Sequence, residues 1–180
     1  MFGGTGRKLD IMSRHARQQP SAKFNTGKQL KIFRADFEAH LQAAQLRYVD
    51  YRLDIRDLPK SYLANSVKPR DILEEHFFRS PQIDSLIEAD EMTALFILKQ
   101  LFHRSLVHHM EYMSLEQAEQ LAGRFADFFP SDASYFTNCE WDTTSGNIGW
   151  SNPITASLLD AGVACVGGGR MGYFWIEEDD

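Results

Sequence analysis

The carboxy-terminal part of the chain contains two short apolar runs joined by a glycine-rich turn. The runs are residues 163–166 and 173–176, and residues 167–170 between them read Gly-Gly-Gly-Arg. Glycine adopts the positive φ angles of tight hairpin turns without steric cost, so the pattern predicts a β-hairpin. Neither run alternates apolar and polar residues, which predicts strands that are covered on both faces.

Helical periodicity dominates the preceding part of the chain. Apolar residues at spacings of three and four predict helices in residues 26–48, 68–80, 81–110 and 114–130. Ser114 and Gln117 have the spacing of a capping box at the start of the last of these helices. Residues 48–56 alternate apolar and charged side chains, which predicts a half-buried strand, with a helix continued to residue 55 as the alternative. Residues 135–138 predict a further short strand.

The segment 81–110 is the longest periodic stretch and predicts a helix of roughly 40 Å. Asp90 falls on the apolar stripe of this predicted helix. A carboxylate in an apolar environment needs a hydrogen-bond partner or a counter-charge. Asp90 is therefore expected either to pair with an arginine or an amide, or to belong to a functional site.

These elements predict an α+β fold. A mainly helical amino-terminal two thirds packs on a small antiparallel sheet, formed mostly by the carboxy-terminal third of the 180 residues. Residues 25–180 are expected to form one domain, and residues 1–24 a weakly ordered basic arm.

The charge is distributed unevenly along the chain. Residues 1–34 hold eight of the 19 Lys and Arg residues but one of the 25 Asp and Glu residues, so this segment carries a formal charge of +7 and the remainder −13. Such asymmetry is typical of interaction segments, although the arm could equally fold back on the acidic body. Nucleic acid could be bound only through the arm, and the acidic body would oppose that binding.

The sequence predicts a cytoplasmic protein without a membrane segment. It contains two isolated cysteines, no apolar stretch of membrane-spanning length and no secretory signal. Candidate catalytic groups are few. Cys139 is followed by Glu140 and by Asp142, whose negative charges would raise the pKa of a thiol. His103, His108 and His109 lack the spacing of four residues that places two metal-binding rings on one helix face. No metal site, cofactor or catalytic residue is predicted.

A polar loop between two tryptophans and the acidic end of the chain are the expected contact surfaces for a partner. Residues 142–147 carry hydroxyl and amide groups, and Trp141 and Trp150 flank them. Four carboxylates in succession, which usually remain solvated, end the sequence. The predicted partner-binding residues are Trp141, Asp142, Trp150, Glu177, Glu178, Asp179 and Asp180.

The resulting expectation is a small acidic module that binds a basic protein, such as an immunity protein or inhibitor that neutralises a toxin or nuclease. Electrostatic attraction would accelerate association, and tryptophan is a typical anchor residue at protein interfaces. The alternative is a small enzyme or ligand-binding domain that uses Asp90, a helix histidine and the 142–147 loop.

Overall fold

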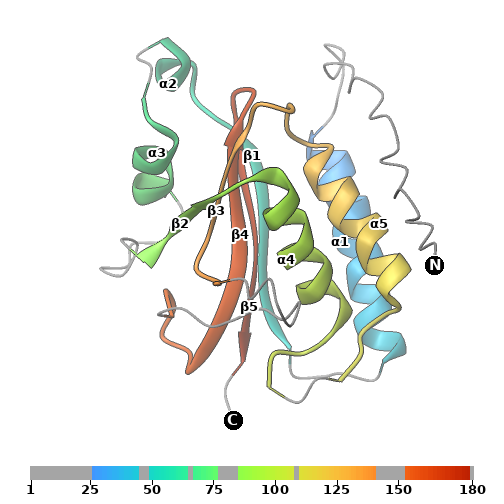
Figure 1. Ribbon diagram of the computed structural model, residues 1–180. Helices are drawn as coiled ribbons and strands as arrows, with labels where there is room; N and C mark the ends of the chain where they lie inside the picture. The colour runs from blue at the N-terminus through green and yellow to red at the C-terminus, as the bar shows by residue number, and fades with distance from the viewer. Residues whose placement is uncertain are drawn as a thin grey trace, which may run out of the picture.

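The computed structural model describes residues 26–44, 49–64, 67–76, 85–107, 110–140 and 153–178 (Figure 1). The helices are α1 (Thr26–Ala43), α2 (Lys60–Ala64), α3 (Pro69–His76), α4 (Glu91–His103) and α5 (Leu115–Ala126). The strands are β1 (Asp50–Asp57), β2 (Ile87–Ala89), β3 (Ser134–Thr137), β4 (Leu159–Gly167) and β5 (Arg170–Glu178). The predicted α+β class is confirmed, and the basic arm at residues 1–24 lies outside the described residues.

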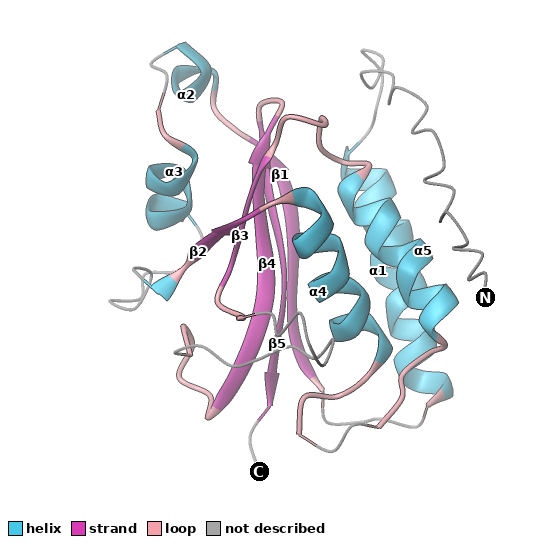
Figure 2. Ribbon diagram, in the orientation of Figure 1, coloured by secondary structure: helices cyan, strands magenta, loops and turns pink. Residues whose placement is uncertain are grey.

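The strands form one antiparallel sheet in the order β1-β5-β4-β3-β2 (Figure 2). Strands β3, β4 and β5 form a meander, and β1 pairs with the outer side of β5. The predicted hairpin is confirmed as β4 and β5. Gly168 and Gly169 form its turn with φ angles of 59° and 74°, as a tight hairpin turn that matches the twist of the strands requires.

Both faces of the central strands are covered, as their apolar sequence predicts. On one face, helices α1, α4 and α5 bury a large core against the sheet. The rings of Phe37, Phe102 and Phe174 meet at its centre, with centroid separations of 4.3 to 5.4 Å. On the other face, Ile72 and Leu73 of α3 pack in a smaller cluster that includes Trp175 of β5. None of the described helices has the length and apolar character that crossing a membrane requires.

Residues 50–57 form a strand, so the alternative of a helix continued to residue 55 is wrong. Leu53 and Ile55 are buried against the helices, whereas Arg52 and Arg56 on the opposite face are exposed. A strand places these two sets on opposite faces, which a helix cannot do with period-two spacing.

The predicted helix over residues 81–110 is confirmed only for residues 91–103, and its predicted extent is wrong. Residues 87–89 form β2 and pair with β3, and α4 begins only at Glu91. Asp90 is the N-cap of α4, where its carboxylate accepts a hydrogen bond from the backbone N–H of Thr93 at 2.7 Å. The apolar periodicity ran through a short strand and a cap, and Asp90 never lies on the apolar stripe of the helix. Its partner is a backbone amide at the helix start.

Helix α5 begins as predicted. The Ser114 hydroxyl accepts a hydrogen bond from the backbone N–H of Gln117, and the Gln117 side chain accepts one from the backbone N–H of Ser114. The reciprocal pair satisfies two amide groups that lack partners within the helix.

Candidate functional site

At one end of the sheet, the lower end in Figure 1, β1 and β4 begin and β3 and β5 end. Three carboxylates of neighbouring strands lie at this end, and a fourth follows β3. The strand register places Asp50 of β1 opposite Glu177 of β5, and Glu177 opposite Asp160 of β4. Glu140 follows β3, two residues beyond Asn138, whose side chain bonds to Asp160. We call Asp50, Glu140, Asp160 and Glu177 the acidic end of the sheet.

Glu177 is held in place by neighbouring side chains. Arg52 of β1 contacts both of its carboxylate oxygens, with Nη2 3.0 Å from Oε2, and the Ser157 hydroxyl lies 3.4 Å from Oε2. The Glu177 side chain is 12% exposed as a result. Like charges directly opposite each other destabilise a sheet, and Arg52 offsets that repulsion between Asp50 and Glu177.

Asp160 is buried, and its carboxylate is satisfied by hydrogen bonds. Its Oδ2 accepts from the backbone N–H groups of Ile154 at 2.9 Å and Thr155 at 2.5 Å, and its Oδ1 accepts from Asn138 Nδ2 at 2.6 Å. The Asn138 side-chain oxygen Oδ1 accepts a hydrogen bond from the backbone N–H of Gly162 at 3.2 Å. These bonds fix residues on both sides of segment 141–152 to the same point of the sheet.

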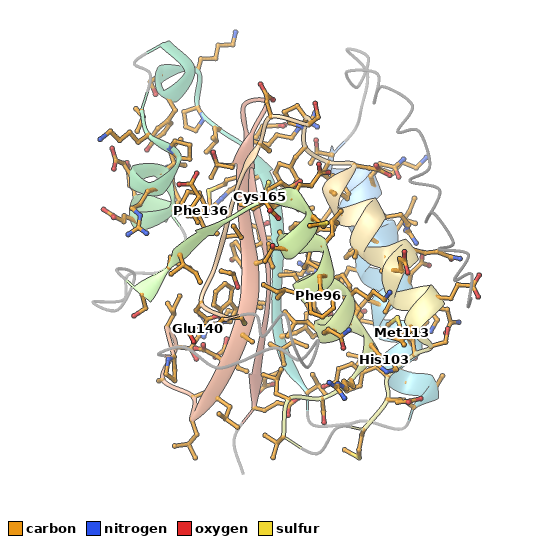
Figure 3. All side chains as sticks on the ribbon, viewed as in Figure 1. Phe96, His103, Met113, Phe136, Glu140 and Cys165 are labelled. Carbon is orange, nitrogen blue, oxygen red and sulfur yellow. The ribbon has the colours of Figure 1, made fainter. Side chains whose placement is uncertain are left out.

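Asp50 and Glu140 are the accessible carboxylates of the acidic end. Both side chains are exposed, and within the described part of the chain neither carboxylate has a hydrogen-bond or ion-pair partner. Figure 3 labels Glu140 beside the lower half of the sheet, on the segment that follows β3. Among the described residues, the acidic end therefore presents two unpaired carboxylates, Asp50 and Glu140, together with two that the fold holds rigidly.

Glu178 lies on the opposite face at the same end, and it is buried. Its carboxylate accepts hydrogen bonds from the backbone N–H groups of Leu106 and Val107, at 3.1 and 2.9 Å, and from the Tyr112 hydroxyl at 2.8 Å. Burial, followed by the nearby charge of Glu178, raises the pKa of Tyr112. Glu178 thus fastens the segment after α4 to the end of β5.

The structure locates two of the seven predicted partner-binding residues. Glu177 and Glu178 have partners within the fold, so the expectation of a solvated run of four carboxylates is wrong for these two. Five lie outside the described residues, as does the 142–147 loop: Trp141, Asp142, Trp150, Asp179 and Asp180. Sequence reasoning missed Asp50 and Glu140. The period-two pattern of residues 48–56 put Asp50 on the polar face, but only the register shows that it faces Glu177.

Cys139 is buried beneath this end, and burial raises the pKa of its thiol to about 12. The sequence pattern predicted that the negative charges of Glu140 and Asp142 would raise this pKa. Desolvation is the larger cause, and the negative charge of Asp160 contributes less. A thiol that stays protonated is a poor nucleophile.

Of the residues in the alternative enzyme hypothesis, the two that the structure describes, Asp90 and His103, do not converge. Asp90 precedes the first residue of α4 and His103 is the last, so the 13-residue helix separates them by about 20 Å. The His103 Nδ1 donates a hydrogen bond to the Met113 carbonyl at 2.7 Å. His108 and His109 lie outside the described residues. In the described ranges, no group of three or more His, Cys, Asp or Glu side chains is arranged to hold a metal ion.

No protein-family model matches the chain, and no curated protein or solved structure is significantly similar to it. The structure defines an α+β protein whose sheet ends in a group of carboxylates. The function is inferred from that geometry.

Proposed function

We propose that this protein is a binding module of the immunity or inhibitor type, which binds a basic partner protein through the acidic end of its sheet. The observation that carries the proposal is the exposure of Asp50 and Glu140, whose carboxylates have no counter-charge among the described residues. Clustered charges of one sign attract and orient a partner of opposite charge and accelerate association.

The scaffold around these two carboxylates is rigid. Asp160 fixes residues 154 and 155, and Arg52 fixes Glu177, so the surface between β1 and β3 is organised before a partner arrives. Preorganisation of this kind reduces the entropy lost on binding. In the sequence, Trp141 directly follows Glu140, and tryptophans are frequent anchors at protein interfaces.

The acidic end also contains like charges that face each other across the strands, which lowers the stability of the fold. Asp50 lies directly opposite Glu177, with Asp160 on the far side of Glu177. Local arrangements that oppose stability are often retained for function. Replacing Asp50 by asparagine is therefore expected to leave stability unchanged or slightly improved while weakening partner binding.

The first experiment measures binding of a fluorescent oligolysine peptide by anisotropy at low and at high salt. Wild type is expected to bind at low salt, and Glu140→Gln combined with Asp50→Asn is expected to weaken binding severalfold. Glu74→Gln, which removes an exposed carboxylate on α3, is the matched control and should bind like wild type. Equal binding by the double variant and the control would refute the acidic end as the site.

The second experiment identifies the natural partner with the same variants as baits in cells that express this protein. A basic protein retained by wild type and by Glu74→Gln, but lost from the double variant, supports the proposal. Proteins retained equally by all three baits count against it.

A further inference from the structure

Strand β1 is an edge strand, and the structure shows which of its backbone groups face outward. The backbone N–H of Leu58 donates to the Gly169 carbonyl at 2.7 Å, which continues the β1–β5 register. Backbone groups alternate sides along an antiparallel strand. The even-numbered residues of β1 therefore bond to β5, and the N–H and C=O groups of Tyr51, Leu53, Ile55 and Asp57 face away from the sheet.

An arginine covers the middle of this edge. Arg34 of α1 donates from Nη2 to the outward carbonyl of Leu53 at 2.5 Å, and Leu53 is only 5% exposed. The opposite edge strand, β2, has a similar contact: Arg70 donates a hydrogen bond to the carbonyl of Leu86, the residue before β2. Exposed strand edges invite pairing with another chain, and proteins commonly cover them.

The charges on β1 are complementary to a second copy of the same strand. On the face opposite α1, α4 and α5, the strand carries Asp50, Arg52, Asp54 and Arg56 in alternating sign. When two copies run antiparallel with Leu53 opposite Leu53, Arg52 of each copy faces Asp54 of the other, and Asp50 faces Arg56. Centring the pair one residue away, on Arg52 or Asp54, places like charges opposite each other wherever two charged residues of these strands face.

The backbone geometry is compatible with this alignment. Outward-facing residues of two paired edges form the hydrogen-bonded pairs, and Leu53 is outward-facing. Arg52 and Asp54 then form the closer, non-hydrogen-bonded pairs, where cross-strand ion pairs contribute most directly. Backbone direction requires only that odd-numbered residues face odd-numbered residues. Among the registers that satisfy it, the charge pattern favours the one centred on Leu53, in which all four charged residues face opposite charges.

We propose that the β1 edge is a docking surface for a second copy of this chain, joined about a two-fold axis at Leu53, and that Arg34 limits this association by competing for the Leu53 carbonyl. The pairing would continue the sheet across both copies. The inference goes beyond binding of a basic partner, because it rests on Arg34, Arg52 and Asp54. Asp50 serves both surfaces, so the two associations compete for it.

The test is sedimentation velocity over a concentration series. Wild type is expected to dimerise weakly, and Arg34→Ala to lower the dissociation constant about tenfold or more, since each dimer no longer displaces two charge-assisted hydrogen bonds. In the Arg34→Ala background, Asp54→Arg places like charges opposite each other and should give monomers. Asp132→Arg, an exposed change outside β1, should leave the dimer intact.

A charge exchange keeps the test independent of folding defects. Arg52→Asp alone should also be monomeric, whereas an equimolar mixture of the Arg52→Asp and Asp54→Arg chains should form a heterodimer, since every facing pair is again of opposite sign. Two misfolded chains would not recover association on mixing. A monomeric Arg34→Ala chain, or a mixture no more associated than its components, would overturn the proposal without affecting the oligolysine result for Glu140.

Discussion

Tyr112 donates a hydrogen bond to Glu178, 66 residues later in the chain, with its hydroxyl 2.8 Å from Oε1. The same carboxylate accepts the backbone N–H groups of Leu106 and Val107. A buried carboxylate with three donors of this kind joins the segment after α4 to the last strand. Removing it leaves three buried donors without an acceptor.

Glu178→Ala is therefore expected to lower the free energy of unfolding by about 2–4 kcal/mol, the range found when a buried, hydrogen-bonded charge is deleted. Urea denaturation of the purified chain measures it. Glu119→Ala is the control, because Glu119 is exposed and pairs only with Lys99 on the surface, a contact of about 0.5 kcal/mol. A loss for Glu178→Ala no larger than for Glu119→Ala would contradict the assigned role.

The raised pKa of Tyr112 predicts a loss of stability at alkaline pH. In the folded state the tyrosine stays protonated above its ordinary pKa of 10.0, whereas in the unfolded chain it ionises near that value. The unfolded state therefore binds fewer protons, and stability falls as the pH rises through 10. Urea midpoints between pH 8 and 11 measure this slope. Tyr112→Phe should be less stable at neutral pH but show a shallower decline, and an unchanged slope would argue against Tyr112 as a source.

Gly162 and Gly123 form a matched pair for testing close packing. A Cβ at Gly162 would lie 2.1 Å from Cε3 of Trp175, whereas nothing lies within 4 Å of a Cβ at Gly123 in α5. Gly162→Ala is expected to destabilise the fold by about 3 kcal/mol or more through overpacking. Gly123→Ala should stabilise it by about 0.5–1 kcal/mol through helix propensity. Thermal unfolding of both variants suffices, and similar melting temperatures would show that Trp175 does not lie against Gly162.

Asp90→Ala tests the helix cap. Loss of the hydrogen bond to the Thr93 N–H should cost about 1 kcal/mol, and Asp90→Asn should recover most of it, because asparagine is also a good N-cap. Hydrogen bonds from Thr93 lower the pKa of Asp90. The stabilisation from the ionised cap is thus present at neutral pH and is lost as the pH falls through the titration of the carboxylate. Urea denaturation at pH 7 and pH 3 measures the difference in unfolding free energy between wild type and Asp90→Asn. A difference that shrinks at pH 3 would confirm the role of the ionised cap, and an equal difference at both pH values would contradict it.

The two thiols should be unreactive in the native state. Cys139 and Cys165 are both buried, and burial raises the pKa of both thiols. Ellman's reagent is expected to label neither at pH 8 and both after unfolding in guanidinium chloride. Rapid labelling of one thiol in the native protein would show that its cover opens readily, and Cys139→Ser would then identify which one reacts.

Local patterns sufficed wherever an element's own residues determine it. The glycines at 168 and 169 predicted the β4–β5 turn, the alternation in 48–56 predicted β1, and Ser114 with Gln117 predicted the start of α5. Each of these signals is complete within a few residues. The α+β class followed because helical and strand patterns are largely segregated along the chain.

Where an element depends on distant partners, sequence reasoning failed. The three residues of β2 are a strand because they pair with β3, and their spacing also suits a helix. Asp90 was misplaced for the same reason. The acidic end shows the same limit, since Asp50 and Glu177 meet only through a register between β1 and β5 that no local pattern encodes.

The strand order also has a consequence for synthesis of the protein. Arg52 and Glu177, which pair across β1 and β5, are separated by 125 residues, so β1 leaves the ribosome long before its neighbour exists. Until β5 is made, the edge of β1 that pairs with β5 has no partner strand, and contacts this remote in sequence form slowly. Nascent chains are therefore most vulnerable to aggregation or chaperone binding between the synthesis of β1 and that of β5. A translational pause after β1 would lengthen this interval.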